Sequence, residues 1–356
     1  MPSVAAALGV PGFHDSLGIE ESAGMRPRHV VVVLVDGLGW HQLRGHAALA
    51  PNLLGGRPVS TAFPSTTPVG LASLGTGMSP GGHGMVGAAF YLPETDAILH
   101  PLAWADDPHP QAVQPERTIL ESIAASGTRV RSVGPRAFAH SGLTRAALRG
   151  GDYAGADSVG ERLAQASAAG PEPGLTYMYW GDLDKTGHVH GVDSDAWREE
   201  LRHVDSIIGR LRERLPQESV LVVTADHGMV DCSDADRINI DDGPLHQGVR
   251  RVAGEPRMRH VYTRQGAAAE VAATWAETLG SAAWVLSREG VVDSGLYGAV
   301  EADYADRIGD VVAIARGRTA LISPRTDAMV SSLRGQHGSL SPDEMAVPLI
   351  VLPVRP

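Results

Sequence analysis

The sequence predicts an α/β fold built around a parallel sheet. Three apolar runs, each closed by a carboxylate and a glycine, carry this prediction: HVVVVLVDGLG (29–39), GLTYMYWGDLDKTGH (174–188) and SVLVVTADHGM (219–229). Uninterrupted apolar runs are typical of strands buried on both faces of a parallel sheet. Between the second and third runs, apolar residues recur at helical spacing from Trp197 to Leu215. A strand, a helix and a second strand in this order imply a right-handed crossover between parallel strands.

Two other stretches interrupt this alternation. Residues 91–139 are less periodic and rich in proline, aspartate and histidine, so we expect an excursion over the sheet. Residues 244–325 contain the strand-like runs RMRHVYT and DVVAIARGRTALI and the helix-like run AAAEVAATWAETLG. We therefore expect one catalytic domain over 1–356, with a small α+β subdomain at 244–325 inserted before the last functional segment.

Composition excludes several classes of protein. The formal net charge of −11 over 356 residues argues against binding of a nucleic acid polymer, which needs a basic surface. A single cysteine, Cys232, excludes a disulfide within the chain. No apolar run approaches the ~18 residues of a membrane span, and the first residues lack the basic and apolar regions of a signal peptide. We therefore expect a cytoplasmic protein without a membrane partner; its oligomeric state is not predicted.

A carboxylate follows each of the three predicted strands, a histidine follows two of them, and one more histidine lies in a Gly-Gln-His-Gly turn near the C-terminus. Ligands of open parallel sheets bind beyond the carboxyl ends of the strands. Carboxylates and imidazoles gathered there are suited to divalent cations. Asp36, the Asp184–His188 pair and His337 are each more often structural when taken alone, whereas Asp226 and His227 after a buried strand need partners and are less easily explained in that way. The prediction therefore rests on the whole set. The set is Asp36, Asp182, Asp184, His188, Asp226, His227 and His337.

Three hydroxyl residues precede a proline in the stretch FPSTTPVGLASLGTG (63–77). Pro68 suits the first position of a helix, because its missing N–H would have no partner there. That places Thr67 at the N-cap, where free N–H groups and the helix dipole favour a tetrahedral anion. A plain helix cap is the ordinary interpretation of such a run. A bound dication could instead hold the Thr67 oxygen as an alkoxide nucleophile.

Taken in order, these motifs resemble the alkaline phosphatase superfamily, and most closely its type I phosphodiesterase / nucleotide pyrophosphatase branch, from about His29 to Val354. The family pattern has an Asp after the first strand (VDGLG) and a nucleophile at a helix N-terminus ten residues before a Gly (Thr67 and Gly77). Asp-x-x-x-His (DKTGH), Asp-His-Gly (ADHGM) and a final His (GQHGSLSP) follow. The resemblance implies a three-layer αβα sandwich around a mostly parallel sheet.

The resemblance also implies a site for two divalent metal ions, Zn²⁺ in the first instance and Mn²⁺ as the alternative. Thr67 would be the catalytic nucleophile and would pass through a phosphothreonine intermediate. Asp182 competes with Asp184 as a ligand, and the spacing to His188 favours Asp184. The implied ligands are Asp36, Asp226, His227 and Thr67 for one metal, and Asp184, His188 and His337 for the other.

The implied activity is metal-dependent hydrolysis of a small phosphate ester by a phosphodiesterase or nucleotide pyrophosphatase. A phosphomonoesterase or a phosphonate hydrolase using the same site is the alternative. One position departs from the family pattern: the nucleotide pyrophosphatases have an asparagine that binds a phosphate oxygen, and the corresponding position here, at about Ala88, has none. Arg145, Arg257 and Arg259 are candidate anion contacts, although a structural role is more usual for each of them.

Overall fold

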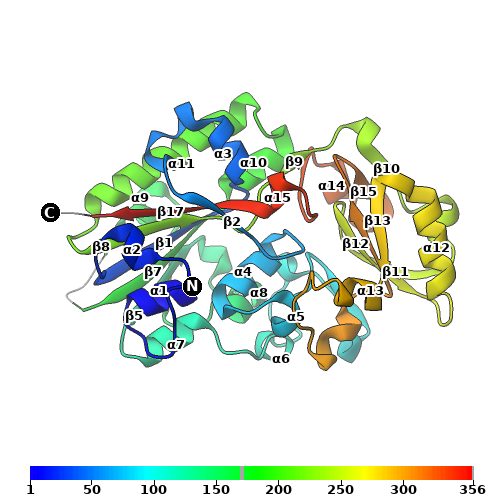
Figure 1. Ribbon diagram of the computed structural model, residues 1–356, viewed down its shortest axis with the longest axis horizontal. Helices are drawn as coiled ribbons and strands as arrows, with labels where there is room; N and C mark the ends of the chain where they lie inside the picture. Colours follow the sequence, from blue (N-terminus) through cyan, green and yellow to red (C-terminus); the bar gives the residue numbers. More distant parts are fainter. Residues whose placement is uncertain (169–171, 355–356) are drawn as a thin grey trace.

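The computed structural model describes residues 1–168 and 172–354, and its centre is a large sheet with helices on both faces (Figure 1). Within those residues the sheet has seven strands in the order β2-β17-β8-β1-β7-β5-β6. The strands from β8 to β6 are parallel, β17 runs antiparallel to β8, and β2 runs antiparallel to β17. Their bounds are β1 (His29–Val35), β2 (Arg57–Ser60), β5 (Arg129–Gly134), β6 (Asp152–Gly155), β7 (Gly174–Trp180), β8 (Ser219–Thr224) and β17 (Ala346–Pro353).

The two faces of the sheet pack against different helices, which makes three layers. One layer contains α3 (Trp40–Gly45), α9 (Val159–Ala166), α10 (Asp182–His190) and α11 (Asp195–Arg214). The other contains α1 (Pro2–Ala7), α2 (Ile19–Ala23), α4 (Thr67–Thr76), α7 (Ile119–Ala125) and α8 (Gly142–Ala147).

Strand β1 shows why the sheet is covered twice. All seven of its residues are buried. Val30, Val32 and Leu34 belong to the apolar cluster on the α4 side. Val31, Val33 and Val35 belong to the cluster on the α11 side. Because successive side chains of a strand point to opposite faces, a continuous apolar run is what a doubly covered strand requires. The predicted fold class is confirmed.

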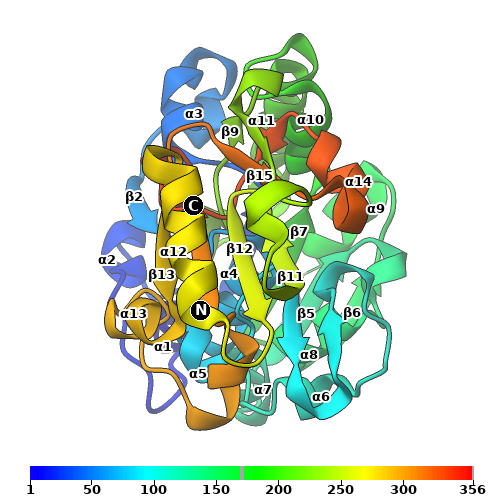
Figure 2. The ribbon, with the colours of Figure 1, turned by 90° about the vertical axis from the view of Figure 1, so that its right-hand side faces the viewer.

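A second, four-stranded antiparallel sheet lies at one end of the central sheet, within residues 244–325 (Figures 1 and 2). Helix α12 (Ala268–Leu279) covers it, and Trp275 is fully buried in a separate apolar cluster between the two. We keep 244–325 as the proposed extent of the subdomain. Its strands, in sheet order, are β11 (Val249–Glu255), β12 (Met258–Thr263), β14 (Val311–Ala315) and β13 (Ala283–Ser287).

The expected excursion at 91–139 was too long. Its last part forms α7 and β5, and β5 is a strand of the central sheet that pairs with β7 and β6. Strand β5 reads RVRSVG and its neighbour β6 is a short, partly exposed edge strand. Polar residues near a sheet edge remove the continuous apolar run on which the prediction depended.

Shorter elements complete the described chain. None of the described helices combines the length and the apolar composition needed to cross a membrane. The remaining elements are β3 (Phe90–Leu92), β4 (Ala97–Leu99), β9 (Val230–Asp231), β10 (Arg237–Asn239), β15 (Ala320–Ile322), β16 (Gly335–Gln336), α5 (Pro80–His83), α6 (Pro110–Val113), α13 (Arg288–Asp293), α14 (Pro324–Ser332), α15 (Pro342–Met345) and several single 3₁₀ turns.

Candidate active site

Three carboxylates lie close together at the carboxyl-terminal ends of the central strands. Strand β1 lies between β7 and β8, with Val35 level with Trp180 and Leu34 level with Thr224. The residues that follow these strand ends are therefore neighbours in space. Asp36, Asp184 and Asp226 meet there, as the pattern of strand ends predicts.

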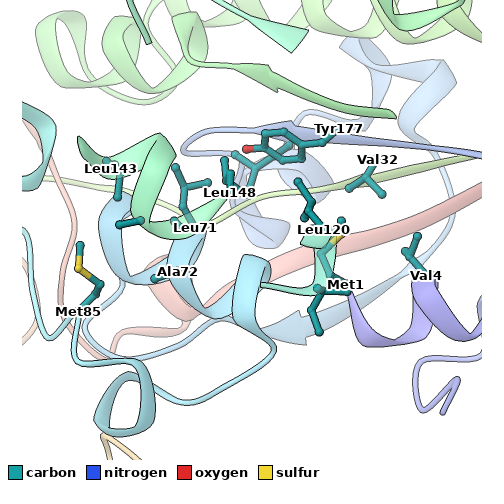
Figure 3. Close-up of a cluster of buried hydrophobic side chains, with 14 of the residues drawn as sticks. Met1, Val4, Val32, Leu71, Ala72, Met85, Leu120, Leu143, Leu148 and Tyr177 are labelled. Carbon is teal, nitrogen blue, oxygen red and sulfur yellow. The ribbon is translucent and has the colours of Figure 1, made fainter. Parts of the chain in front are cut away.

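Helix α4 carries Thr67 to the same place. The helix begins one residue earlier than expected: Thr66 is the N-cap and Thr67 is the first helical residue. Pro68 is tolerated one position further in because the N–H groups of the whole first turn lack helical acceptors. The position of Thr67 is fixed by packing below it, where Leu71 lies among Leu148 and Tyr177 (Figure 3).

The first cluster gathers Thr67, Asp36, Asp226 and His227. The Thr67 Oγ1 lies 3.2 Å from His227 Nε2 and 3.4 Å from each carboxylate oxygen of Asp36. His227 Nε2 is 3.3 Å from Asp36 Oδ1 and 3.9 Å from Asp226 Oδ2. Asp36 and His227 thus lie next to the Thr67 hydroxyl, with Asp226 beside His227.

The second cluster gathers Asp184, His188 and His337. Asp184 and His188 are one turn apart on α10, and His188 Nε2 lies 3.3 Å from Asp184 Oδ2. His337 Nε2 is 3.2 Å from His188 Nε2 and 4.0 Å from Asp184 Oδ1. Asp184 also lies within ligand distance of Asp36 and His227, so the two clusters adjoin.

All three imidazoles direct Nε2 toward the clusters and Nδ1 toward the surrounding backbone. Their Nδ1 atoms lie 2.7 Å, 2.9 Å and 3.0 Å from the backbone carbonyl oxygens of Gly335, Gly228 and Ser65, for His188, His227 and His337 respectively. A carbonyl can only accept, so each Nδ1 donates, and Nε2 is the ring nitrogen left to bind a metal ion. This outer hydrogen bond is the usual arrangement of a metal-ligating histidine.

The concentration of carboxylates in the site favours the binding of cations. Burial, followed by the negative charges of Asp226 and Asp184, raises the pKa of Asp36 well above its usual range. Asp184 Oδ1 and Asp226 Oδ2 are buried and have no hydrogen-bond partner among the described residues. Three neighbouring carboxylates, two of them with a buried oxygen that has no hydrogen-bond partner, are costly unless positive charge is bound between them. The oxygen and imidazole donors fit two divalent metal ions of the zinc or manganese type.

Three supporting residues were not predicted. The Tyr179 hydroxyl donates to Asp36 Oδ2 at 2.5 Å. The Ser65 hydroxyl donates to the Ser339 carbonyl at 2.7 Å and accepts from Gly338 N, next to His337. Glu255 Oε2 lies 3.3 Å from His337 Nδ1. The position of Tyr179 near the end of a strand was a usable signal, whereas Glu255 reaches the site from the subdomain and has no signal in the sequence.

Four candidates lie elsewhere. Asp182 is on the wall of the neighbouring cavity, with its side chain 51% exposed. Arg145 pairs with Asp106 on the surface. Arg257 and Arg259 are buried and paired with Glu344 and Asp327, so both arginines are structural.

A cavity of about 430 Å³ opens beside Thr67. Asp36, Thr67 and Asp184 form one end of it, and the side chains of Tyr177 and Tyr179 line its wall. A hydroxyl at a helix N-terminus, two clusters of ligand-type side chains and an adjoining cavity together are suited to phosphoryl chemistry on a small ester.

The model of the type I phosphodiesterase / nucleotide pyrophosphatase family matches residues 30–340. The chain belongs to this family. The match includes Asp36, Thr67 and His337, so the site described above lies within the family region.

Curated relatives match over short segments. The human ectonucleotide pyrophosphatase/phosphodiesterase family member 7 is 40% identical over 60 residues, which are 15% of this chain and 13% of that protein. The bis(5'-adenosyl)-triphosphatase ENPP4 of Bos taurus is 34% identical over 100 residues, 25% of this chain and 22% of that protein. A phosphopentomutase of Symbiobacterium thermophilum is 29% identical over 122 residues, 34% of this chain and 30% of that protein.

Solved structures match the fold over nearly the whole chain. Murine ectonucleotide pyrophosphatase/phosphodiesterase 5, in an inactive form with AMP, gives a TM-score of 0.74 at 20% identity, covering 91% of this chain and 88% of that one. Phosphonoacetate hydrolase of Sinorhizobium meliloti with phosphonoformate gives a TM-score of 0.68 at 21% identity, covering 93% of this chain and 92% of that one. The alkaline-phosphatase-type fold is therefore shared by this chain.

Proposed function

We propose that this protein is a metal-dependent phosphodiesterase or nucleotide pyrophosphatase that acts on a small phosphate ester through Thr67. One observation carries the proposal: the Thr67 hydroxyl lies at a helix N-terminus, within 3.4 Å of His227 and Asp36, beside a second cluster of ligand type. Membership of the family and the adjoining cavity support it.

In the proposed reaction the Thr67 oxygen loses its proton and attacks phosphorus, and the bond to one ester oxygen breaks so that this alcohol leaves with a proton. The rest of the substrate stays on Thr67 as a phosphothreonine ester, and water cleaves that ester, which releases the phosphomonoester and restores the Thr67 hydroxyl. The free N–H groups at the start of α4 point toward the same place and favour the charge of the phosphoryl oxygens. Tyr179 holds Asp36, and the Nδ1 hydrogen bonds hold the imidazoles, so the donor atoms are oriented before substrate arrives.

Asp36, Asp226, His227 and the Thr67 oxygen would hold one metal, and Asp184, His188 and His337 the other. When bound, Zn²⁺ or Mn²⁺ would lower the pKa of coordinated oxygen groups and offset negative charge on the phosphoryl group. Zinc is the metal we propose first, because three of the ligands are imidazoles.

The test compares hydrolysis of bis-p-nitrophenyl phosphate and p-nitrophenyl phosphate by metal-stripped protein reloaded with Zn²⁺ or Mn²⁺. We expect faster cleavage of the diester and no turnover after stripping. Thr67→Ala should lower kcat by about a thousandfold or more, because the nucleophile is removed. Equal diester rates for Thr67→Ala and the wild type would reject the proposal.

One observation favours the alternative of a phosphomonoesterase or phosphonate hydrolase. Ala88 offers no side-chain donor where the nucleotide pyrophosphatases have asparagine. A higher kcat/KM for the monoester, or for a phosphonate, would favour that alternative on the same Thr67 site. The cytoplasmic location remains a prediction, which cell fractionation tests.

A further inference from the structure

The cavity beside Thr67 extends well beyond the two ligand clusters. Its walls include the ends of β1, β7 and β5 and Tyr153 of the edge strand β6, together with side chains of α4, α8, α9 and α10. Neighbouring strands lie about 4.8 Å apart, so the three steps from β1 to β6 cover roughly 14 Å. Together with the volume of about 430 Å³, this leaves room for a substantial group attached to the scissile phosphorus.

The walls of the cavity are of two kinds. Some of the lining is apolar and aromatic, with Leu71, Leu148 and Phe138 besides the two tyrosines. Two cationic side chains also line the cavity, Arg162 and Lys185, and Lys185 is the only lysine of the sequence. The carboxylate near them, Asp182, is half exposed to solvent.

The side chain of Arg162 is fixed by packing and by one hydrogen bond, but one of its nitrogen atoms has no acceptor. The residue is 7% exposed, its Nε donates to the Ala156 carbonyl at 3.1 Å, and its guanidinium lies 4.5 Å over the ring of Trp180. Its Nη1 is buried without a hydrogen-bond partner among the described residues, and Asp182 Oδ2 is 3.8 Å away. A buried guanidinium N–H without an acceptor is unfavourable, so a ligand that brings an acceptor would be stabilised here.

We propose that Arg162 and Lys185 bind a second anionic group of the substrate, a carboxylate or phosphate carried on the substituent of the scissile phosphorus. The inference rests on the proposed hydrolysis at Thr67. It deepens that function by defining the substrate class as esters with two separated anionic centres. The competing interpretation is that Arg162 only packs α9 against Trp180.

The experiment uses two p-nitrophenyl phosphodiesters that differ in the second ester arm. One arm ends in a carboxylate and the other in the methyl ester of that carboxylate, so the leaving group is identical. We expect the wild type to have the higher kcat/KM for the carboxylate. Lys185→Met and Arg162→Lys should each lower this preference, by about tenfold for the loss of a charged hydrogen bond.

Arg136→Gln is the matched control. Arg136 is an exposed arginine that pairs with Glu161 of the same helix, α9, and it does not line the cavity. This variant should keep the wild-type preference. Thermal melts of each variant show whether it is folded, and calorimetric binding of the carboxylate diester to Thr67→Ala measures affinity without turnover.

The outcomes separate the two proposals. If the wild type hydrolyses neither diester, the proposed function fails and this inference fails with it. If it hydrolyses both with equal kcat/KM, and folded Arg162 and Lys185 variants keep that ratio, only the second anionic site is rejected. A preference lost in both variants and kept in Arg136→Gln establishes the site.

Discussion

At the residue scale, the site is defined by hydrogen bonds made on the outer side of its proposed metal ligands. Backbone carbonyls accept from the three Nδ1 atoms, and Tyr179 donates to Asp36. Burial, together with the nearby charge of Asp36, raises the pKa of Tyr179 well above its usual range, so its hydroxyl stays a donor. The ligand atoms are thereby oriented even before any metal binds.

Tyr179→Phe removes one of these outer hydrogen bonds and little else. We expect the affinity for the metal at the Asp36 cluster to fall by about 10- to 100-fold, as for other losses of a hydrogen bond to a ligand. Metal titration of the stripped protein measures this. Tyr91→Phe is the matched control, because Tyr91 donates to Asp96 on the surface. Equal metal affinity for both variants would contradict the role given to Tyr179.

We expect the buried side chain of His260 to make the free energy of unfolding depend on pH. Its Nε2 faces the Val86 carbonyl at 3.0 Å and its Nδ1 accepts from Gly309 N at 3.2 Å, which requires a neutral ring. Burial lowers the pKa of His260 to about 4. The pKa of an unfolded histidine is near 6.5. The contribution of the neutral His260 ring to the free energy of unfolding is therefore complete above that pH and is lost as pH falls from about 6.5 to 4.

Urea unfolding at pH 7 and pH 5 checks this prediction. The loss of stability caused by His260→Gln should be smaller at pH 5 than at pH 7, by about 2 kcal/mol, because the wild type has already lost that amount. Tyr262→Phe in the same strand should cost the same at both pH values. An unchanged cost for His260→Gln would show that the ring does not titrate as stated.

At the element scale, the close approach of α4 to the end of β8 positions Thr67, the proposed nucleophile. Gly70 makes this possible, since a Cβ at that position would lie 2.6 Å from the Cβ of Asp226. Real Cβ atoms do not approach so closely, so either the helix or Asp226 must shift when a side chain is added. The position of Thr67 relative to Asp226 therefore depends on the absence of a side chain at Gly70.

Gly70→Ala should therefore destabilise the protein by about 1–3 kcal/mol through overpacking. It should also lower kcat by roughly a hundredfold, since displacements near 1 Å at a reacting group have that effect. The control is Gly160→Ala in α9, where a Cβ meets nothing within 4 Å and we expect a gain of about 0.5–1 kcal/mol. Melting temperatures and kcat for both variants test the prediction, and wild-type kcat in Gly70→Ala would refute it.

The same scale explains what the sequence could and could not predict. Strands β1, β7 and β8 were predicted because each is buried on both faces and reads as an apolar run. Strands β5 and β6 were missed because they lie toward the edge and contain polar residues. The local motifs identified residues that the structure brings together, including His337. Glu255 was not identified, because only the tertiary packing of the subdomain places it beside His337.

At the scale of the whole molecule, the inserted sheet is joined to the active-site loop by a buried ion pair. Arg257, between β11 and β12, donates to Glu344 through Nη2 at 2.7 Å and Nε at 3.1 Å, and both side chains are fully buried. Glu344 also accepts from Ser339 N at 2.9 Å, two residues after His337. The subdomain thus supports the segment that carries a proposed ligand.

Arg257→Met leaves the Glu344 carboxylate buried without its cation, so we expect a loss of about 3–5 kcal/mol in urea unfolding. Adding Glu344→Gln removes that unpaired charge and should restore part of the loss. Arg202→Met, which breaks an exposed pair with Glu199 on α11, should cost no more than about 1 kcal/mol. Because the His337 segment loosens with the pair, Arg257→Met should also retain less metal after dialysis. A cost as small as that of Arg202→Met, with full metal retention, would show that the subdomain does not support the site.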